Sequence, residues 1–336
     1  MPQRMPVTSL SLKSLAARPL RDIPGFRDFR VPMYSLSSCW NSGRHTCGRE
    51  MLNEIRSLGF EYAELSHGIR LSLLPGIIQS VEAGEIRISS LHNFCPLPMG
   101  VTHPAPNLFK FTALDRRERE NAWKHSLKTL DTAARLKAQL VVLHMGAVEM
   151  KDYTDRLLDL ISEGKRETSK YEKLLEEALE KREARKEPHV EAAHSFLRGL
   201  AEEATQRGLK LGIENREALE EIPFESDFHL FFREFQEPCI GYWHDTGHGQ
   251  IKANLGVIHH AMHVGGLAQR LFGFHIHDVE FPGRDHMVPG TGSIDYAALK
   301  PYVKPEHLKV LELSPATPIE LIPQGLAHIQ SLWGPE

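Results

Sequence analysis

The feature that most constrains the fold of this chain is a regular alternation of short apolar runs with longer amphipathic stretches. Eight of the short runs have the length and composition of buried β-strands, and the stretches between them are typical of α-helices. Eight such units in about 300 residues favour an α/β fold, a closed (β/α)8 TIM barrel, over an open doubly wound sheet. The predicted strands are Val31–Leu36, Glu61–Leu65, Ile86–Leu91, Gln139–His144, Leu209–Glu214, Ile240–Asp245, Leu271–His277 and Leu308–Leu313.

The chain is expected to consist of an N-terminal arm and one barrel domain. Residues 1–30 hold six Lys or Arg against two acidic residues, and they lack the apolar core of a secretory leader, so we interpret them as an arm. Residues 31–336 form the predicted single TIM-barrel domain. A charged helical insertion of about residues 151–190 interrupts its pattern after the fourth strand.

This insertion holds 10 Lys or Arg and 12 Asp or Glu between residues 151 and 191. Opposite charges three and four positions apart predict a helix over Lys165–Lys186. Leu174, Leu175 and Leu179 give that helix only a narrow apolar stripe, so we expect it to lie outside the barrel core. A solvated helix, a lid over the substrate site and an arm for assembly are the interpretations that stay open.

Composition excludes several classes of protein. Lys and Arg total 40 and Asp and Glu total 44, a formal net charge of −4, which argues against a nucleic-acid partner. The four cysteines fit no disulfide framework or zinc-ribbon spacing. No apolar run approaches the roughly 18 residues of a membrane span, and no Gly-x-Gly-x-x-Gly follows the first strand. We expect a cytoplasmic protein without a membrane partner.

Polar residues stand at the carboxyl ends of six predicted strands, where TIM-barrel enzymes place their active sites. One such residue is usually an ordinary rim residue, but six at the same rim indicate a functional site. They are His92, His144, Glu214, Asp245, His275 with His277, and Glu312.

Glu214 and Glu312 are each embedded in an apolar run, and a buried carboxylate must be paired, hydrogen-bonded or bound to a cation. No Lys or Arg stands inside a strand that neighbours either of them. Imidazole and carboxylate together suit a divalent ion such as zinc, manganese or cobalt, and no cysteine joins the set. The sequence therefore predicts a divalent metal site at this rim.

Two further segments add candidate residues. In HDTGH at 244–248, Asp245 ends the strand, Gly247 permits a tight turn, and His248 returns to the rim to contact substrate or a second ion. Asp285 and His286 lie in a Gly- and Pro-rich loop and are candidates for substrate binding or a further metal ion. Arg216, two residues after Glu214, is a candidate substrate contact.

The sequence resembles the xylose isomerase-like TIM-barrel superfamily, specifically its sugar phosphate isomerase/epimerase family, which is related to endonuclease IV-type enzymes. The segments that carry the resemblance, in this order, are SSLH at 89–92, VVLHMG at 141–146, GIEN at 212–215, HDTGH at 244–248, HIHD at 275–278, DHMVPGTGSIDY at 285–296 and VLEL at 310–313.

The resemblance implies a mononuclear metal site whose ligands are Glu214, Asp245, His275 or His277, and Glu312. It also implies that His248 contacts the substrate. The implied enzyme is a divalent-metal-dependent isomerase or epimerase of a sugar, sugar acid or cyclitol, working through an enediolate intermediate with Glu214 and Glu312 as the catalytic groups. Its metal is Mn, Zn, Co or Mg, its partner is a small carbohydrate, and a homo-oligomer stays open.

Other functions remain open on the same scaffold. The endonuclease IV-type members hold up to three ions, and their additional ligands match His92, His144, His248 and the Asp285–His286 pair. A multinuclear hydrolase or phosphodiesterase therefore competes most directly with the epimerase, although this chain has Asp285 and His286 adjacent where the nuclease pattern separates them by one residue. A lyase or dehydratase on this scaffold, or a sugar-binding protein without catalysis, also stays open.

Overall fold

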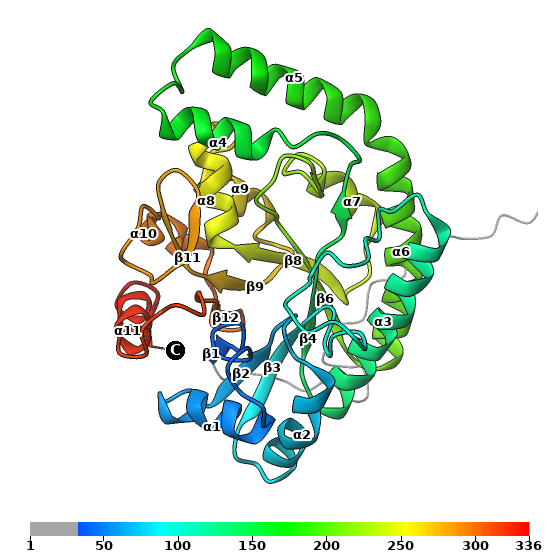
Figure 1. Cartoon of the computed structure of the whole chain (residues 1–336), viewed down its shortest axis with the longest axis vertical. Coiled ribbons are helices and arrows are strands. Elements are labelled where there is room, and N and C mark those ends of the chain that lie inside the picture. Colours follow the sequence, from blue (N-terminus) through cyan, green and yellow to red (C-terminus); the bar gives the residue numbers. More distant parts are fainter. Residues whose placement is uncertain (1–32, 336) are drawn as a thin grey trace, which may run out of the picture.

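The computed structural model describes residues 33–335 (Figure 1), so the predicted arm at 1–30 lies outside the described residues. Within residues 33–335, eight parallel strands close into a barrel in the order β1-β12-β9-β8-β6-β4-β3-β2. This confirms the predicted (β/α)8 TIM barrel. The barrel strands are β1 (Met33–Ser37), β2 (Tyr62–Leu65), β3 (Arg87–His92), β4 (Leu140–Leu143), β6 (Lys210–Glu214), β8 (Ile240–Asp245), β9 (Leu271–Ile276) and β12 (Leu308–Leu311).

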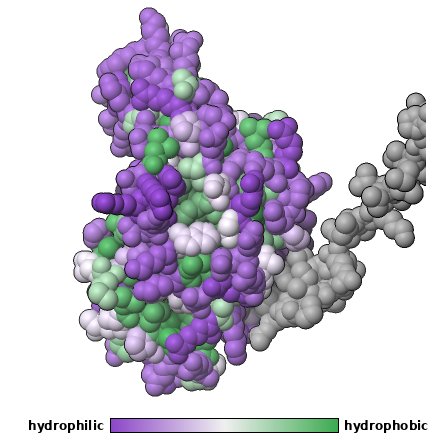
Figure 2. Space-filling model, turned by 90° about the vertical axis from the view of Figure 1, so that its right-hand side faces the viewer, coloured by the Kyte–Doolittle hydropathy of each residue, from purple (hydrophilic) through white to green (hydrophobic). Residues whose placement is uncertain are grey.

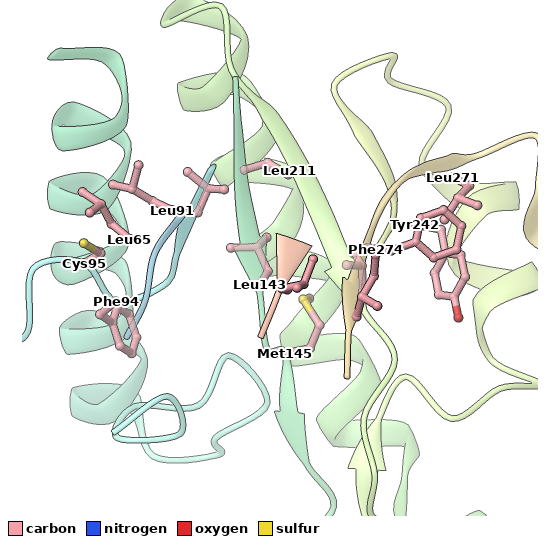
Figure 3. Packing of buried hydrophobic residues seen from close by; sticks show 14 of the residues in the cluster. Leu65, Leu91, Phe94, Cys95, Leu143, Met145, Leu211, Tyr242, Leu271 and Phe274 are labelled. Carbon is pink, nitrogen blue, oxygen red and sulfur yellow. The ribbon is translucent and has the colours of Figure 1, made fainter. Parts of the chain in front are cut away.

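Helices surround the barrel and connect its strands (Figure 1). They bury an apolar layer between themselves and the outer faces of the strands, and Figure 3 shows Leu91, Leu143, Leu211 and Phe274 in this layer. The helices are α1 (Gly48–Ser57), α2 (Leu74–Glu82), α3 (Arg116–Arg135), α6 (Glu187–Gln206), α7 (Phe228–Glu234), α8 (Thr246–Asn254), α9 (His260–Leu267), α10 (Tyr296–Leu299) and α11 (Leu321–Trp333). None of the helices among the described residues is long and apolar enough to cross a bilayer.

The barrel interior is filled by side chains that alternate with those of the outer layer along each strand. The lower part of the interior is apolar and holds Tyr62, Val142, Trp243 and Val310. Toward the carboxyl ends of the strands, the interior becomes polar. This change positions the candidate site above an apolar floor.

Short strands extend the loops at the carboxyl end of the barrel. β5 (Gly146–Ala147) pairs with β7 (Glu221–Ile222), and β10 (Asp278–Glu280) pairs with β11 (Arg284–Met287), each antiparallel. These pairs draw the loops after β4, β6 and β9 over the rim. They therefore bring residues from beyond the strand ends back toward the site.

The charged segment forms two helices, α4 (Thr154–Ser162) and α5 (Ser169–Arg185), so the helix predicted over Lys165–Lys186 is present. These helices project from one side of the barrel, and the surface of this projection is largely hydrophilic (Figure 2). The buried stripe of α5 differs from the predicted one, because it consists of Tyr171, Leu174, Ala178 and Arg182. Arg182 donates hydrogen bonds to the backbone oxygens of Leu219 and Glu221, so α5 is attached to the loop after β6 and is not simply solvated.

Candidate metal centre

Four side chains from four strands meet at the carboxyl end of the barrel. Glu214 ends β6, Asp245 ends β8, His275 lies near the end of β9, and Glu312 follows β12. One potential ligand atom from each lies within 4.8 Å of the corresponding atoms of the other three, and all four residues are buried. The structure thus brings together the set that the sequence singled out as metal ligands.

His275 lies at the centre of this group of four. Its Nδ1 atom is 2.7 Å from Glu214 Oε1 and 3.0 Å from Glu312 Oε2, and 3.8 Å from Asp245 Oδ2. Burial alone would lower the pKa of His275, but the carboxylates of Glu312, Glu64 and Glu214 raise it well above its ordinary value. Three carboxylates converging on one imidazole need a positive charge among them. A divalent ion bound to the same atoms would provide it.

The structure gives His275 and His277 different hydrogen-bond partners, although strand alternation alone places both side chains on the same side of the strand. The backbone N–H of His286 donates to His277 Nδ1 at 2.8 Å, so the proton of the neutral ring must stand on Nε2. That Nε2–H points at Asp245 Oδ2 at 2.9 Å. Both nitrogens of His277 are therefore hydrogen-bonded, one of them to Asp245, whereas Nδ1 of His275 faces Glu214 and Glu312.

Asp245 is held from both sides. Its Oδ2 accepts from His277, and its Oδ1 accepts from the backbone N–H of His248 at 2.8 Å as the N-cap of α8. Burial would raise the pKa of Asp245, but His248 and His277 lower it far below its ordinary value. Asp245 is therefore an ionised, rigidly oriented carboxylate.

The tight turn predicted at Gly247 is wrong, because α8 begins directly after Asp245. The absence of a side chain at Gly247 serves packing: a Cβ there would collide with the His277 ring. Glycine at this position lets the first turn of α8 approach His277 closely. The start of α8 was not predicted because the segment TGHG contains two glycines in one turn, and glycine has low helix propensity.

His92 and His144 lie beside Glu214 on its other side. His144 Nε2 is 2.6 Å from Glu214 Oε2, and His92 Nε2 is 3.5 Å from the same oxygen. The Nδ1 atom of His92 faces the backbone oxygen of Asn93 at 3.0 Å, so its proton stands on Nδ1 and the Nε2 lone pair faces Glu214 when the ring is neutral. This trio is a second group with the donor types of a metal site.

Arg216 pairs with Glu214, although no neighbouring strand supplies a cation. Its guanidinium lies 3.1 Å from Glu214 Oε2 and 3.1 Å from Glu221 Oε1, and it is buried. Burial would raise the pKa of Glu214, but His144, His275 and Arg216 hold it well below its ordinary value. In the structure, Arg216 is a charge partner of Glu214 and Glu221, and the substrate contact suggested by the sequence stays a prediction.

His248, Asp285 and His286 lie nearer the opening. His248 Nδ1 faces the backbone oxygen of Asn215 at 3.0 Å, and its Nε2 is directed toward Asp285 Oδ2 at 3.9 Å. His286 stacks on the ring of His277 with centroids 4.3 Å apart. The side chains of Asp285 and His286 are 25% and 31% exposed, so they are accessible from the mouth of the site.

The Asp285–His286 pair makes a pH-dependent contribution to stability in the metal-free protein. Burial alone would lower the pKa of His286, but the Asp285 carboxylate 3.0 Å away raises it to about 9. Since this exceeds the ordinary histidine value of about 6.5, the contribution is complete below about pH 6.5 and is lost as the pH rises through about 9. We expect the difference in melting temperature between wild type and Asp285→Asn to shrink over that interval. A difference that stays constant from about pH 6 to pH 10 would contradict this assignment.

Besides Glu221, which pairs with Arg216, sequence reasoning missed further polar residues of this region, among them Glu64, His67 and Glu217. Glu64, in β2, contacts His275, and its signal was the same as that of Glu214 and Glu312, a Glu inside an apolar run. His67 follows β2 and packs its ring 4.8 Å from that of His92. Glu217 joins His248 and Asp285 in a group near the opening, and only the path of the loop after β6 places it there.

The sequence of residues 52–332 matches the family described as xylose isomerase-like TIM barrel. No curated protein matches the chain. Among solved structures, 3-keto-D-glucoside 4-epimerase from E. coli is similar at 15% identity and a TM-score of 0.63, covering 89% of this chain and 99% of that chain. D-psicose 3-epimerase from Clostridium cellulolyticum H10 has 13% identity, a TM-score of 0.63 and coverage of 90% and 99%.

A third similar structure is the IOLI protein with a bound zinc atom, at 15% identity and a TM-score of 0.61, covering 89% of this chain and 99% of that chain. At these identities, the likeness to the three structures concerns the fold. The family match runs from within α1 to within α11 and includes every barrel strand after β1. The chain belongs to the xylose isomerase-like TIM barrel family.

Proposed function

We propose that this protein is a divalent-metal-dependent isomerase or epimerase of a small carbohydrate, such as a sugar, sugar acid or cyclitol. The observation that carries the proposal is the buried convergence of Glu214, Asp245, His275 and Glu312 at the active-site end of the barrel. Family membership and the names of the similar structures, two of which are sugar epimerases, support the same class of reaction.

The residues fit a divalent ion. Three carboxylates and one imidazole are the ligands that Mn, Zn, Co and Mg accept, and no cysteine belongs to the group. When bound, such an ion would supply Lewis-acid polarisation of a substrate carbonyl and stabilise the charge of an enediolate. Glu214, Asp245, His275 and Glu312 would hold it, and His277 would keep Asp245 oriented.

Glu214 and Glu312 are the proposed proton-transfer groups, because they come from non-adjacent strands of the barrel and face the same space. His144, His275 and Arg216 hold the pKa of Glu214 well below its ordinary value, so its ionised form is a poor base. Glu312 pairs with His275 through its Oε2 atom, so its second oxygen is the better placed to remove a proton. His248 would orient a substrate hydroxyl through its Nε2 atom.

A cavity of about 760 Å³, the size of a small-molecule site, lies between the charged segment and the loops after β4 and β6, and the four proposed ligands are not among its lining residues. Glu217 lines this cavity and also lies beside His248 and Asp285, so the cavity reaches the group nearest the opening of the barrel. Asp155 and Leu158 of α4 form part of its wall. The charged segment is therefore proposed to shape substrate access from one side.

The second candidate function is a multinuclear metal-dependent hydrolase. It is favoured by the group formed by His92, His144 and Glu214, which adjoins the first group through Glu214. The net charge of −4 gives no general attraction for a nucleic-acid backbone. The number of bound ions and the reaction therefore separate the two candidates.

The deciding experiment combines metal analysis with solvent exchange. We expect one equivalent of Mn, Zn or Co per chain after dialysis, and deuterium incorporation next to the carbonyl of a ketose incubated in D2O. Two or three tightly bound ions together with phosphodiester cleavage, and no exchange with any ketose or inosose, would instead establish the hydrolase.

Removing the ion should also lower stability. A ligand present at about 100 times its dissociation constant stabilises the native state by about 2.7 kcal/mol, so dialysis against a chelator should reduce the melting temperature and added metal should restore it. An unchanged melting temperature across this cycle, with metal removal verified by elemental analysis, would contradict a metal centre at this position.

A further inference from the structure

Glu64 is a buried carboxylate in the barrel interior whose contacts are unusually complete. It lies on β2 between Ser37 of β1 and Ser90 of β3, which are its direct neighbours in the strand register. The hydroxyl of Ser37 donates to Glu64 Oε1 at 3.0 Å, and that of Ser90 donates to Oε2 at 2.8 Å. All three residues are fully buried, so the carboxylate is fixed from both sides.

The remaining partner of this carboxylate is His275. The Nε2 atom of His275 lies 3.1 Å from both oxygens of Glu64. The opposite ring nitrogen, Nδ1, is the atom that faces Glu214 and Glu312. His275 therefore separates Glu64 from the carboxylates of the proposed metal centre.

The partners of the two ring nitrogens of His275 require one tautomer of the neutral ring. A ring nitrogen binds a metal through its lone pair, so neutral His275 can offer Nδ1 only when its proton stands on Nε2. An ionised Glu64 accepts hydrogen bonds and donates none. Because Ser37 and Ser90 already donate to it, Glu64 is oriented to accept the Nε2–H as well.

We propose that Glu64 is a positioning residue that fixes the ring orientation and tautomer of His275, so that Nδ1 is presented to the metal. The proposal rests on the proposed metal centre but not on the identity of the substrate. Glu64 contacts the Nε2 edge of the ring, and within the described part of the chain no hydrogen bond or ion pair joins it to Glu214, Asp245 or Glu312. Outer carboxylates of this type typically change metal affinity about 10- to 100-fold.

The test is zinc affinity of the full chain, measured by competition with a chromophoric chelator. Glu64→Gln is isosteric but replaces an acceptor-only group with an amide, and we expect zinc binding to weaken about 10- to 100-fold. Ser35→Ala is the matched control, because Ser35 is buried on β1 two residues before Ser37 and its hydroxyl has no hydrogen-bond partner among the described residues. The control should stay within about twofold of wild type.

Nitrogen-15 spectra of the zinc-loaded protein give a second readout that loss of packing alone would not produce. Wild type should show His275 protonated at Nε2, and Glu64→Gln should perturb that signal. Equal zinc affinity and an unchanged His275 spectrum in Glu64→Gln would overturn the proposal. If Glu64→Gln does not fold, Ser90→Ala replaces it as the test, because this variant keeps the carboxylate of Glu64 but removes one of its two hydroxyl donors. Weaker zinc binding by Ser90→Ala supports the proposal, and unchanged zinc binding overturns it.

Zinc binding by the unmodified chain separates the role of Glu64 from the proposed reaction. If wild type binds zinc and Glu64→Gln binds it weakly, the role of Glu64 stands even where no sugar shows exchange. If wild type binds neither zinc nor manganese, the metal centre and the role of Glu64 are both overturned.

Discussion

Glu312→Gln should leave the barrel folded and reduce turnover by about 10²- to 10⁴-fold, the usual contribution of a general base. The substitution is isosteric and keeps one oxygen to face His275, which lies 3.0 Å from Glu312 Oε2. It removes the basic carboxylate that we propose takes the substrate proton. Glu214 does not replace it readily, since three cationic or imidazole partners stabilise its ionised form.

The measurement is deuterium exchange and epimer formation with the ketose that wild type accepts. Metal content and the melting temperature must be recorded for the same sample, so that loss of the ion is distinguished from loss of the base. Glu306→Gln is a suitable control, because Glu306 precedes β12 and is exposed. Near-wild-type turnover of Glu312→Gln with the ion retained would show that Glu312 is only a ligand or a bystander.

The barrel could be predicted from the sequence because its strands are buried on both faces and therefore form continuous apolar runs. Each of the eight predicted strands overlaps an observed one. The position of the site followed from the same pattern, since parallel strands direct all their carboxyl ends to one rim. Glu214, Asp245, His275 and Glu312 are brought together by this topology alone.

The partners of these residues depend on loops, and local patterns do not encode the paths of loops. The backbone N–H that fixes the tautomer of His277 belongs to His286, which returns through the β10–β11 hairpin. Arg216 reaches Glu214 from beyond the end of β6. Glu64, unlike these partners, could have been identified from the sequence. It is a glutamate within an apolar run, which is the pattern that singled out Glu214.

The charged segment shows a second limit of pattern reasoning. The spacing of opposite charges predicted the helix, but it treated Arg182 as one more exposed cation. In the structure, the Arg182 side chain is 1% exposed and its guanidinium lies 2.6 Å from Asp227 Oδ2. A hydrophobicity scale counts only apolar residues, so it cannot identify an arginine that occupies a buried position on a helix.

Arg182→Met should lower the free energy of unfolding by about 3 kcal/mol, near the lower end of the range for breaking a buried ion pair. Methionine fills similar space, so the main loss is the charge and the hydrogen bonds to Leu219 O, Glu221 O and Asp227. Asp227 keeps a second partner, Lys186 Nζ at 3.0 Å, which limits the cost.

Denaturant unfolding of the full chain measures this effect, with Lys181→Ala as the control. Lys181 stands next to Arg182 on α5, but its side chain is 42% exposed and its ammonium group pairs with Glu177 and lies 5.7 Å from the centroid of the Tyr153 ring, so its loss should cost clearly less than the loss of Arg182. Arg182→Met should also weaken substrate binding, because Glu221, whose backbone oxygen Arg182 holds, is the partner that positions Arg216 beside Glu214. Equal stability of the two variants would show that α5 contributes no buried anchor and that the loop after β6 is held without it.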